Sequence, residues 1–266
     1  MEFKDKIILI TGASDGIGKR LAIDLSVRDA VIIAIGRSPA RLETVLAEIR
    51  RASPRSISIR CDVGSRAEVH QMISKALGQF PAIDILINNA GIGMRKPFVE
   101  TPLETIEELM RTNYLGTVYC THEILPSMLA RGCGHIVNIS SVAGHIGTLN
   151  MAGYCASKFA INGFSESLYH ELKPRGIAVS LVCPGPVKTA FNRSFAQTSP
   201  KSPRRFIISP ESVSQTVLTI IEKRSFEMIT PRSIAFMCGV KRFMPGLFRA
   251  LSSRLFRYHV LPREKL

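Results

Sequence analysis

Three consecutive segments near the N-terminus constrain the fold most. Residues 6–10 form a short, mostly apolar run, TGASDGIG occupies residues 11–18, and KRLAIDLSVRD continues with helical periodicity. Such a run is typical of a buried parallel strand. The glycines let backbone approach phosphate groups closely, and the N-terminus of the following helix offers N–H groups to them. The order predicts a strand, a turn and a helix that bind a pyrophosphate, although such turns also join strands to helices without any ligand.

Short apolar runs and helical segments alternate along the rest of the chain. The runs cover residues 30–35, 56–61, 84–87, 135–140, 177–183 and 226–229, and the longest helical segments cover residues 152–172 and 210–223. With 266 residues, of which 45% are hydrophobic, the chain is long enough for one α/β domain or two small ones.

The second apolar run ends in Gly36, Arg37 and Ser38, without a carboxylate. At this place in a dinucleotide site an acidic residue binds the ribose 2′-OH, whereas an arginine accommodates a 2′-phosphate. Arg37 therefore favours NADP(H) over NAD(H); the alternative is a solvated arginine heading the next helix. Asp15 opposes this choice, because a carboxylate repels a 2′-phosphate unless it points away.

Polar residues also follow the third and fourth runs. Asp62 either bonds an adenine amino group or caps a helix that starts near Arg66. The NNAG sequence at residues 88–91 continues neither a helix nor a strand well. It favours polar groups that fix a turn beside a cofactor.

Ser141, Tyr154 and Lys158 could form a catalytic set. Tyr154 and Lys158 are four residues apart, which places them on one face of a helix. An ammonium group near the phenol favours tyrosinate and lowers the pKa of Tyr154. Ser141, at the end of a strand, can reach the same point, and two hydroxyl donors suit a carbonyl being reduced or an alcohol being oxidised. Taken alone, the three residues are more typical of a buried tyrosine, a surface lysine and a turn serine than of a catalytic set.

Together the motifs resemble those of the short-chain dehydrogenase/reductase family. They are TGASDGIG, NNAG, a lone Asn113 in MRTNYLGT, the Ser141–Tyr154–Lys158 set and CPGPVKT, in this order between residue 5 and about residue 190. The resemblance implies a single Rossmann-type α/β domain over residues 1–230, with a doubly wound parallel sheet covered by helices on both faces. It also implies an NAD(P)-dependent oxidoreductase that acts on CH–OH groups.

The resemblance assigns a role to each motif residue. Tyr154 would be the general acid/base, and Ser141 would hold the substrate carbonyl oxygen. Lys158 would bond the nicotinamide ribose and lower the pKa of Tyr154. Asn113 would kink its helix and hold a water that relays protons from Lys158. The remaining cofactor contacts would come from Thr11, Gly12, Ser14, Gly16, Ile17 and Gly18 at the pyrophosphate, from Asn89, Ala90 and Gly91 at the ribose, and from Pro184, Gly185, Val187 and Thr189 at the nicotinamide.

The C-terminal part of the chain, which the family motifs do not cover, is strongly basic. The whole chain has 35 basic and 21 acidic residues, a formal charge of +14, and residues 201–266 contribute 13 and 4 of these, or +9. From Pro245 onward, Leu247, Leu251, Leu255 and Tyr258 fall on one helical face with Phe248 beside them, Arg249 and Arg257 fall on the other side, and Arg254 lies at the margin. Residues 231–266 are therefore expected to form a basic amphipathic extension that binds a membrane surface peripherally. The alternatives are a helix that closes the substrate pocket and a subunit contact.

Other sequence features bear on the cellular compartment, on metal binding and on membrane spans. The six cysteines are scattered without metal-ligand spacing, the N-terminus leaves no room for a signal peptide before the first strand, and no run of eighteen apolar residues occurs. These features favour the cytoplasm, no bound metal and no spanning helix. Residues 190–206 are expected to form either a lid over the nicotinamide or a connection without function.

The expected substrate is a small hydrophobic carbonyl or alcohol of the steroid, retinoid or long-chain acyl type, because the tail is apolar and aromatic. One alternative is a 3-ketoacyl reductase that uses its basic surface to dock an acidic carrier protein. Another is a non-catalytic dinucleotide-sensing scaffold, which would not need Asn113, Ser141, Tyr154 and Lys158 together. No nucleic-acid recognition motif accompanies the net charge. The family resemblance implies a homodimer or homotetramer through the helices around Asn113 and Tyr154.

Overall fold

A computed structural model describes residues 3–189, 191, 207–250 and 252. Its centre is a seven-stranded, entirely parallel sheet in the order β3-β2-β1-β4-β5-β6-β7. The strands are β1 (Ile7–Thr11), β2 (Val31–Gly36), β3 (Ile57–Arg60), β4 (Ile85–Asn88), β5 (Gly134–Ile139), β6 (Ile177–Pro184) and β7 (Glu227–Thr230). The strand order reverses between β1 and β4, and ligands of open α/β sheets bind at such a switch point.

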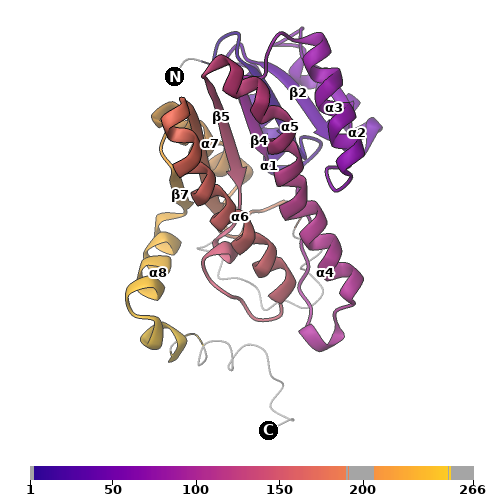
Figure 1. Cartoon of the computed structure of the whole chain (residues 1–266). Helices are drawn as coiled ribbons and strands as arrows, with labels where there is room; N and C mark the ends of the chain where they lie inside the picture. The colour runs from indigo at the N-terminus through magenta and orange to yellow at the C-terminus, as the bar shows by residue number, and fades with distance from the viewer. Residues whose placement is uncertain (1–2, 190, 192–206, 251, 253–266) are drawn as a thin grey trace.

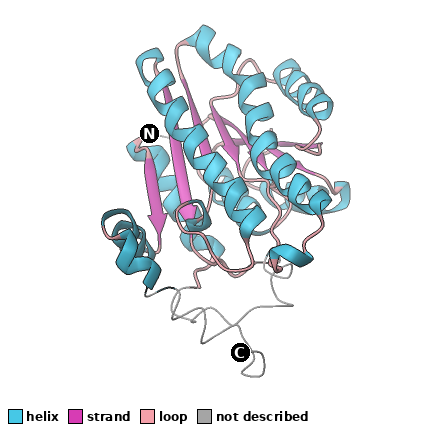
Figure 2. Ribbon diagram, turned by 60° about the horizontal axis from the view of Figure 1, so that its bottom comes forward, coloured by secondary structure: helices cyan, strands magenta, loops and turns pink. Residues whose placement is uncertain are grey.

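Helices cover both faces of the sheet (Figures 1 and 2). On one face, α1 (Gly16–Ser26), α2 (Pro39–Ile49) and α7 (Pro210–Lys223) pack their apolar sides onto the sheet. On the other face, α3 (Arg66–Gln79), α5 (Gly116–Arg131) and α6 (Ala152–Leu172) do the same. Strands β1 and β2 are buried along their whole length, which explains why both read as continuous apolar runs.

The doubly wound sheet expected from the family resemblance is confirmed. Each expected strand lies within a residue or two of its observed bounds, and α6 and α7 have the expected ranges. Short 3₁₀ turns at Phe98–Glu100, Val142–Gly144 and Lys173–Arg175 complete the connections. The helix α4 (Leu103–Leu109) runs into α5 through a π-helical segment at Met110–Leu115 that contains Asn113. Such segments often occur at functional sites.

The C-terminal extension begins with a helix that the sequence pattern did not predict, α8 (Arg232–Phe243). Its Ile234 and Cys238 are buried, and a Cβ added at Gly185 would lie 2.7 Å from Cδ1 of Ile234, so α8 packs against the loop that follows β6. Residues 245–250 are helical as expected. The amphipathic face expected at Leu251, Leu255 and Tyr258, with Arg254 and Arg257, lies outside the described residues, as does the expected lid apart from Phe191. None of the described helices combines the length and apolar character needed to cross a membrane.

Candidate active site

A cavity of about 920 Å³ opens at the carboxyl ends of the strands and runs from the glycine turn after β1 to the N-terminal half of α6. Sixteen of the residues expected at the site line it, and they come from segments far apart in the sequence. They are Gly12, Ser14, Gly16, Ile17, Arg37, Asp62, Asn89, Ala90, Gly91, Ser141, Tyr154, Lys158, Pro184, Gly185, Val187 and Thr189. Thr11, Gly18 and Asn113 lie behind this lining and support it.

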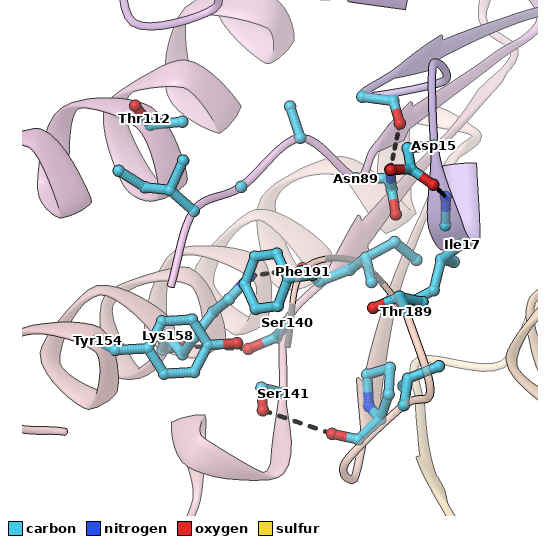
Figure 3. A pocket seen from close by; sticks show the side chains of 18 of the residues that line it. Asp15, Ile17, Asn89, Thr112, Ser140, Ser141, Tyr154, Lys158, Thr189 and Phe191 are labelled. Carbon is cyan, nitrogen blue, oxygen red and sulfur yellow. Dashed lines mark hydrogen bonds between the residues drawn. The ribbon is translucent and has the colours of Figure 1, made fainter. Parts of the chain in front are cut away.

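The glycine turn is built so that no side chain fills the cradle above α1. Gly12 has a φ of +67°, and a Cβ added there would lie 2.8 Å from Cα of Ala90. Asp15 caps α1, because its Oδ1 accepts from Gly16 N at 2.7 Å. Thr189, beyond β6, faces the turn and lies next to Gly16 (Figure 3). The N–H groups at the positive end of the helix therefore face the cavity, as an anion site requires.

Asn89 and Thr11 hold the turn in place from behind. The amide nitrogen of Asn89 donates to the carbonyl oxygens of Thr11 and Gly12 at 2.9 and 3.2 Å, while Oγ1 of Thr11 accepts from Asn89 N and Ala90 N, both at 3.0 Å. These bonds tie the end of β4 to the end of β1. Both side chains therefore shape the cradle, and the Asn89 amide is already occupied by backbone partners.

The cavity contains a second arginine near Arg37, Arg41, which the sequence analysis overlooked. Arg41, four residues later in the first turn of α2, also lines the cavity, and its Nη1 lies 3.8 Å from Oδ2 of Asp15. The available signal was a second arginine in the first turn of the helix that follows Arg37. The carboxylate of Asp15 thus caps α1 and also faces Arg41. The arginine offsets the negative charge of Asp15 at this end of the cavity.

Asp62 lines the cavity but does not cap α3. Ser65 is the cap and accepts from Glu68 N, whereas Asp62 Oδ1 accepts from Gly64 N at 3.0 Å. The capping alternative for Asp62 was therefore wrong, because the helix starts one residue after a serine that does this work. The carboxylate remains at the edge of the cavity, where an adenine amino group could reach it.

Tyr154, Lys158 and Ser141 meet at the other end of the cavity (Figure 3). Tyr154 and Lys158 are buried on one face of α6, with Lys158 Nζ 5.9 Å from the centroid of the Tyr154 ring. Lys158 Nζ also donates to Ile139 O at 3.0 Å, and Ser141 Oγ donates to Pro184 O at 3.4 Å. The helix and the end of β5 thus bring the expected catalytic groups together, as their spacing suggested.

The pKa of Tyr154 differs in direction from the expectation. Burial raises the pKa of Tyr154 to about 12, and a hydrogen bond with Ser141 opposes the shift only partly. Burial also lowers the pKa of Lys158 to about 8. The expectation that Lys158 lowers the pKa of Tyr154 was wrong for this structure, because loss of hydration dominates for both groups. At neutral pH Tyr154 therefore carries its proton and can donate it.

Asn113 is buried in the π-helical segment and acts on the loop after β4. Its Oδ1 accepts from Ile92 N at 2.8 Å, and its Nδ2 donates to Ile92 O and Ser157 Oγ at 3.0 and 2.9 Å. The side chain joins α6 to the loop that carries Gly91. The expected irregularity of its helix is present at this residue.

Comparisons with known proteins agree with this geometry. Residues 6–200 match the family model for short chain dehydrogenases. The epidermal retinol dehydrogenase 2 of Mus musculus is 32% identical over 245 residues, covering 90% of this chain and 78% of that protein. The 3-oxoacyl-[acyl-carrier-protein] reductase of Synechocystis sp. is 35% identical over 185 residues, covering 69% and 75%.

Solved structures with the same fold contain either form of the cofactor. A short chain dehydrogenase/reductase from Burkholderia phymatum in complex with NAD has a TM-score of 0.84 and 25% identity, covering 93% of this chain and 96% of that one. A variant of the actinorhodin polyketide ketoreductase with NADPH has a TM-score of 0.80 and 28% identity, covering 85% and 95%. With its cavity and sequence motifs, this chain belongs to the short-chain dehydrogenase/reductase family of NAD(P)-dependent oxidoreductases that act on alcohol and ketone groups.

Proposed function

We propose that this protein is an NADP(H)-dependent reductase of a hydrophobic carbonyl substrate, with Tyr154 as the general acid. The observation that carries the proposal is a buried Tyr154 next to Ser141 and Lys158, in a cavity that also extends over the phosphate cradle. The cofactor would supply the hydride. Negative charge then develops on the substrate oxygen, and hydroxyl donors aimed at that oxygen stabilise it.

Each catalytic group would have one task. Ser141 would orient the substrate oxygen by a hydrogen bond, and Tyr154 would transfer its proton to it. Lys158 would bind the nicotinamide ribose and, as an ammonium below its pKa of about 8, favour loss of the Tyr154 proton during the reaction. Asn113, which holds the loop at Ile92, would position a water for the proton relay.

The substrate end of the cavity supports an apolar substrate. Its lining there includes Ile92, Val142, Met151, Phe191 and Ile207, with Arg95 as a charged neighbour. The retinol dehydrogenase relative acts on a molecule of this character. A 3-ketoacyl reductase that docks an acidic carrier protein is the second candidate, favoured by the cyanobacterial relative and the net charge of +14.

A substrate panel tests the proposal. NADPH oxidation should be measured with a retinoid aldehyde, a steroid ketone and a short ketoacyl thioester, each with and without an acidic carrier protein. Turnover of the free hydrophobic carbonyls is expected. Turnover confined to the carrier-bound thioester would replace the first candidate by the second, and absence of any turnover would favour a scaffold.

Replacing Arg37 by Ala should weaken binding of NADPH by about 1.5–3 kcal/mol, the free energy of a hydrogen bond to a charged group. NADH lacks the 2′-phosphate, so its binding should change little. Cofactor fluorescence titrations of both nucleotides measure the difference. The matched control is Arg55→Ala, because Arg55 is an exposed arginine that lies outside the cavity lining and faces Asp5. Equal weakening of NADPH and NADH would contradict the assignment of Arg37.

We also propose that the extension from residue 231 rests on an anionic membrane surface. Phe236 and Phe243 on α8 are 74% and 82% exposed, and Met244 and Leu247 follow them, also exposed. Lys241, Arg242 and Arg249 lie in the same stretch. Exposed aromatic groups interleaved with cations suit an interface with anionic lipid. A pocket-closing role is supported only for the other side of α8, where Ile234 packs against Gly185.

A homodimer or homotetramer through the helices around Asn113 and Tyr154 stays a prediction.

Changing both Phe236 and Phe243 to Ser should lower binding to anionic vesicles by at least about tenfold, because each buried phenyl ring contributes roughly 1.5–3 kcal/mol. Both side chains are exposed, so turnover of a water-soluble ketone should not change. Sedimentation with phosphatidylserine vesicles measures the binding, and added salt should weaken it. Val27→Ser, which alters an exposed apolar residue after α1, is the control. Wild-type protein that stays in the supernatant at low salt would end the membrane proposal.

A further inference from the structure

Three potential metal ligands meet beside the active site, at the edge of the sheet formed by β6 and β7. His145 directly follows the 3₁₀ turn after Ser141, Cys183 is in β6, and Glu227 begins β7. Their ligand atoms all lie within 4.8 Å of one another. None of the three lines the cofactor and substrate cavity. The scattered cysteines gave no sign of this group in the sequence, because its members are separated by 38 and 44 residues.

The distances within the group are close to those of a coordination sphere. Nε2 of His145 is 2.9 Å from Oε1 of Glu227, and Sγ of Cys183 is 3.9 Å from the same oxygen. With zinc bonds of about 2.0–2.2 Å to nitrogen and oxygen and about 2.3 Å to sulfur, tetrahedral geometry places these pairs about 3.3 and 3.6 Å apart. Shifts of a few tenths of an ångström would therefore convert the contacts into a metal site.

The charges of the group also suit a divalent cation. One thiolate and one carboxylate together neutralise a 2+ ion, which lowers the cost of holding it in a partly buried place. Cys183 is fully buried, whereas the side chains of His145 and Glu227 are 26% and 33% exposed, so an ion can enter from their side. On binding, the cation would displace the proton of the Cys183 thiol to solvent and would separate His145 Nε2 from Glu227 Oε1 by a few tenths of an ångström.

The surroundings contain one further thiol and two lysines. Cys238 on α8 is buried and close enough to Cys183 and Glu227 for their charges to interact. Lys158 and Lys241 also face the group, but their ammonium groups bond the carbonyl oxygens of Ile139 and His145. Asn162 Nδ2 lies 3.2 Å from His145 Nε2 and keeps a second partner, Gly144 O. Cys238 does not belong to the group whose ligand atoms all lie within 4.8 Å of one another, so the fourth coordination position is left to a water.

We propose that His145, Cys183 and Glu227 form a Zn²⁺ site that joins β6, β7 and the turn after Ser141. A nitrogen, a sulfur and an oxygen ligand suit zinc better than magnesium or calcium, which prefer oxygen alone. The site would act on the reaction indirectly. Cys183 precedes Pro184, whose carbonyl accepts from Ser141, and His145 ends the turn that begins at Ser141. A bound ion would therefore hold the Ser141 hydroxyl in its place.

Metal titration of the full chain tests the site directly. The purified protein, stripped with a chelator, should bind one Zn²⁺ per chain in a calorimetric titration, and Co²⁺ should produce a thiolate-to-metal charge-transfer band. Cys183→Ser and Glu227→Gln should each weaken Zn²⁺ by at least about tenfold, since even lost outer-shell partners cost 10–100-fold. Zn²⁺ should raise the melting temperature of the wild type and leave that of Glu227→Gln unchanged.

The control separates this site from adventitious binding. Cys133 is exposed and directly precedes β5, at the opposite end of the sheet, so Cys133→Ser should bind Zn²⁺ like the wild type. A charge-transfer band that disappears in Cys133→Ser and persists in Cys183→Ser would overturn the proposal. Absence of stoichiometric Zn²⁺ binding by the folded wild type would also overturn it, and the group would then be a contact between His145 and Glu227 beside a buried thiol.

Discussion

Replacing Tyr154 by Phe should lower kcat for carbonyl reduction by about 10²–10⁴-fold, the usual contribution of a positioned general acid. The substitution removes only the hydroxyl group of a buried ring. The ring packs against Leu109 and Ala143, and that packing stays. The Kd of NADPH should therefore be unchanged. Stopped-flow measurement of NADPH oxidation under single-turnover conditions checks the rate, and a fluorescence titration checks the binding.

Tyr169→Phe is the matched control for this change. Tyr169 is on the same helix, but its hydroxyl accepts from Lys173 at the protein surface, far along α6 from the cavity. Its loss should leave kcat unchanged. A Tyr154→Phe protein that reduces a good substrate at the wild-type rate would refute Tyr154 as the acid. A loss of cofactor binding in that protein would instead show that the hydroxyl contacts the cofactor.

Adding one methyl group at Gly18 should destabilise the protein by about 3 kcal/mol or more, at the upper end of the range for overpacking. A Cβ there would lie 2.2 Å from Gly12 O and 2.5 Å from Asn89 Nδ2. Backbone cannot yield as a flexible side chain does, so α1 must move away from the turn after β1. NADPH binding should fall as well, because the cradle depends on the position of the α1 N-terminus. Urea denaturation and cofactor titration of Gly18→Ala measure both effects.

The control uses a glycine in an open place. A Cβ added at Gly78, near the end of α3, meets nothing within 4 Å. Gly78→Ala should leave stability unchanged or raise it by up to about 1 kcal/mol, because alanine favours the helix over glycine. Equal stability of Gly18→Ala and the wild type would show that the close approach of α1 and the turn is relaxed in solution.

The positions of the strands and of the main motifs could be read from the residues themselves. Apolar runs such as residues 7–11 predict buried parallel strands because both faces of such a sheet are covered. Gly18 and the Tyr154–Lys158 spacing follow from local geometry, a close backbone approach and a helical turn. Family resemblance then supplied the doubly wound parallel sheet, and the order of its strands came from the structure.

Some features could be assigned only once the bounds and packing of the helices were known. Asp62 could be judged as a helix cap only once Ser65 was seen to occupy that position. Arg41 lines the cavity with Arg37 because α2 begins at Pro39 and carries Arg41 in its first turn. The helix α8 was missed because its apolar residues contact the end of the sheet on one side and remain exposed on the other.

The sequence by itself located the strands, because buried parallel strands appear as apolar runs. It also indicated the fold family and the candidate catalytic residues, because several motifs that resemble those of one family occur together and in the same order. Only the tertiary structure decided the protonation of Tyr154 and the meeting of His145, Cys183 and Glu227. The loss of hydration of a side chain and the identity of its neighbours depend on all the segments that pack around it. A lysine four residues away predicts a lowered phenol pKa, but burial by the surrounding segments raises it.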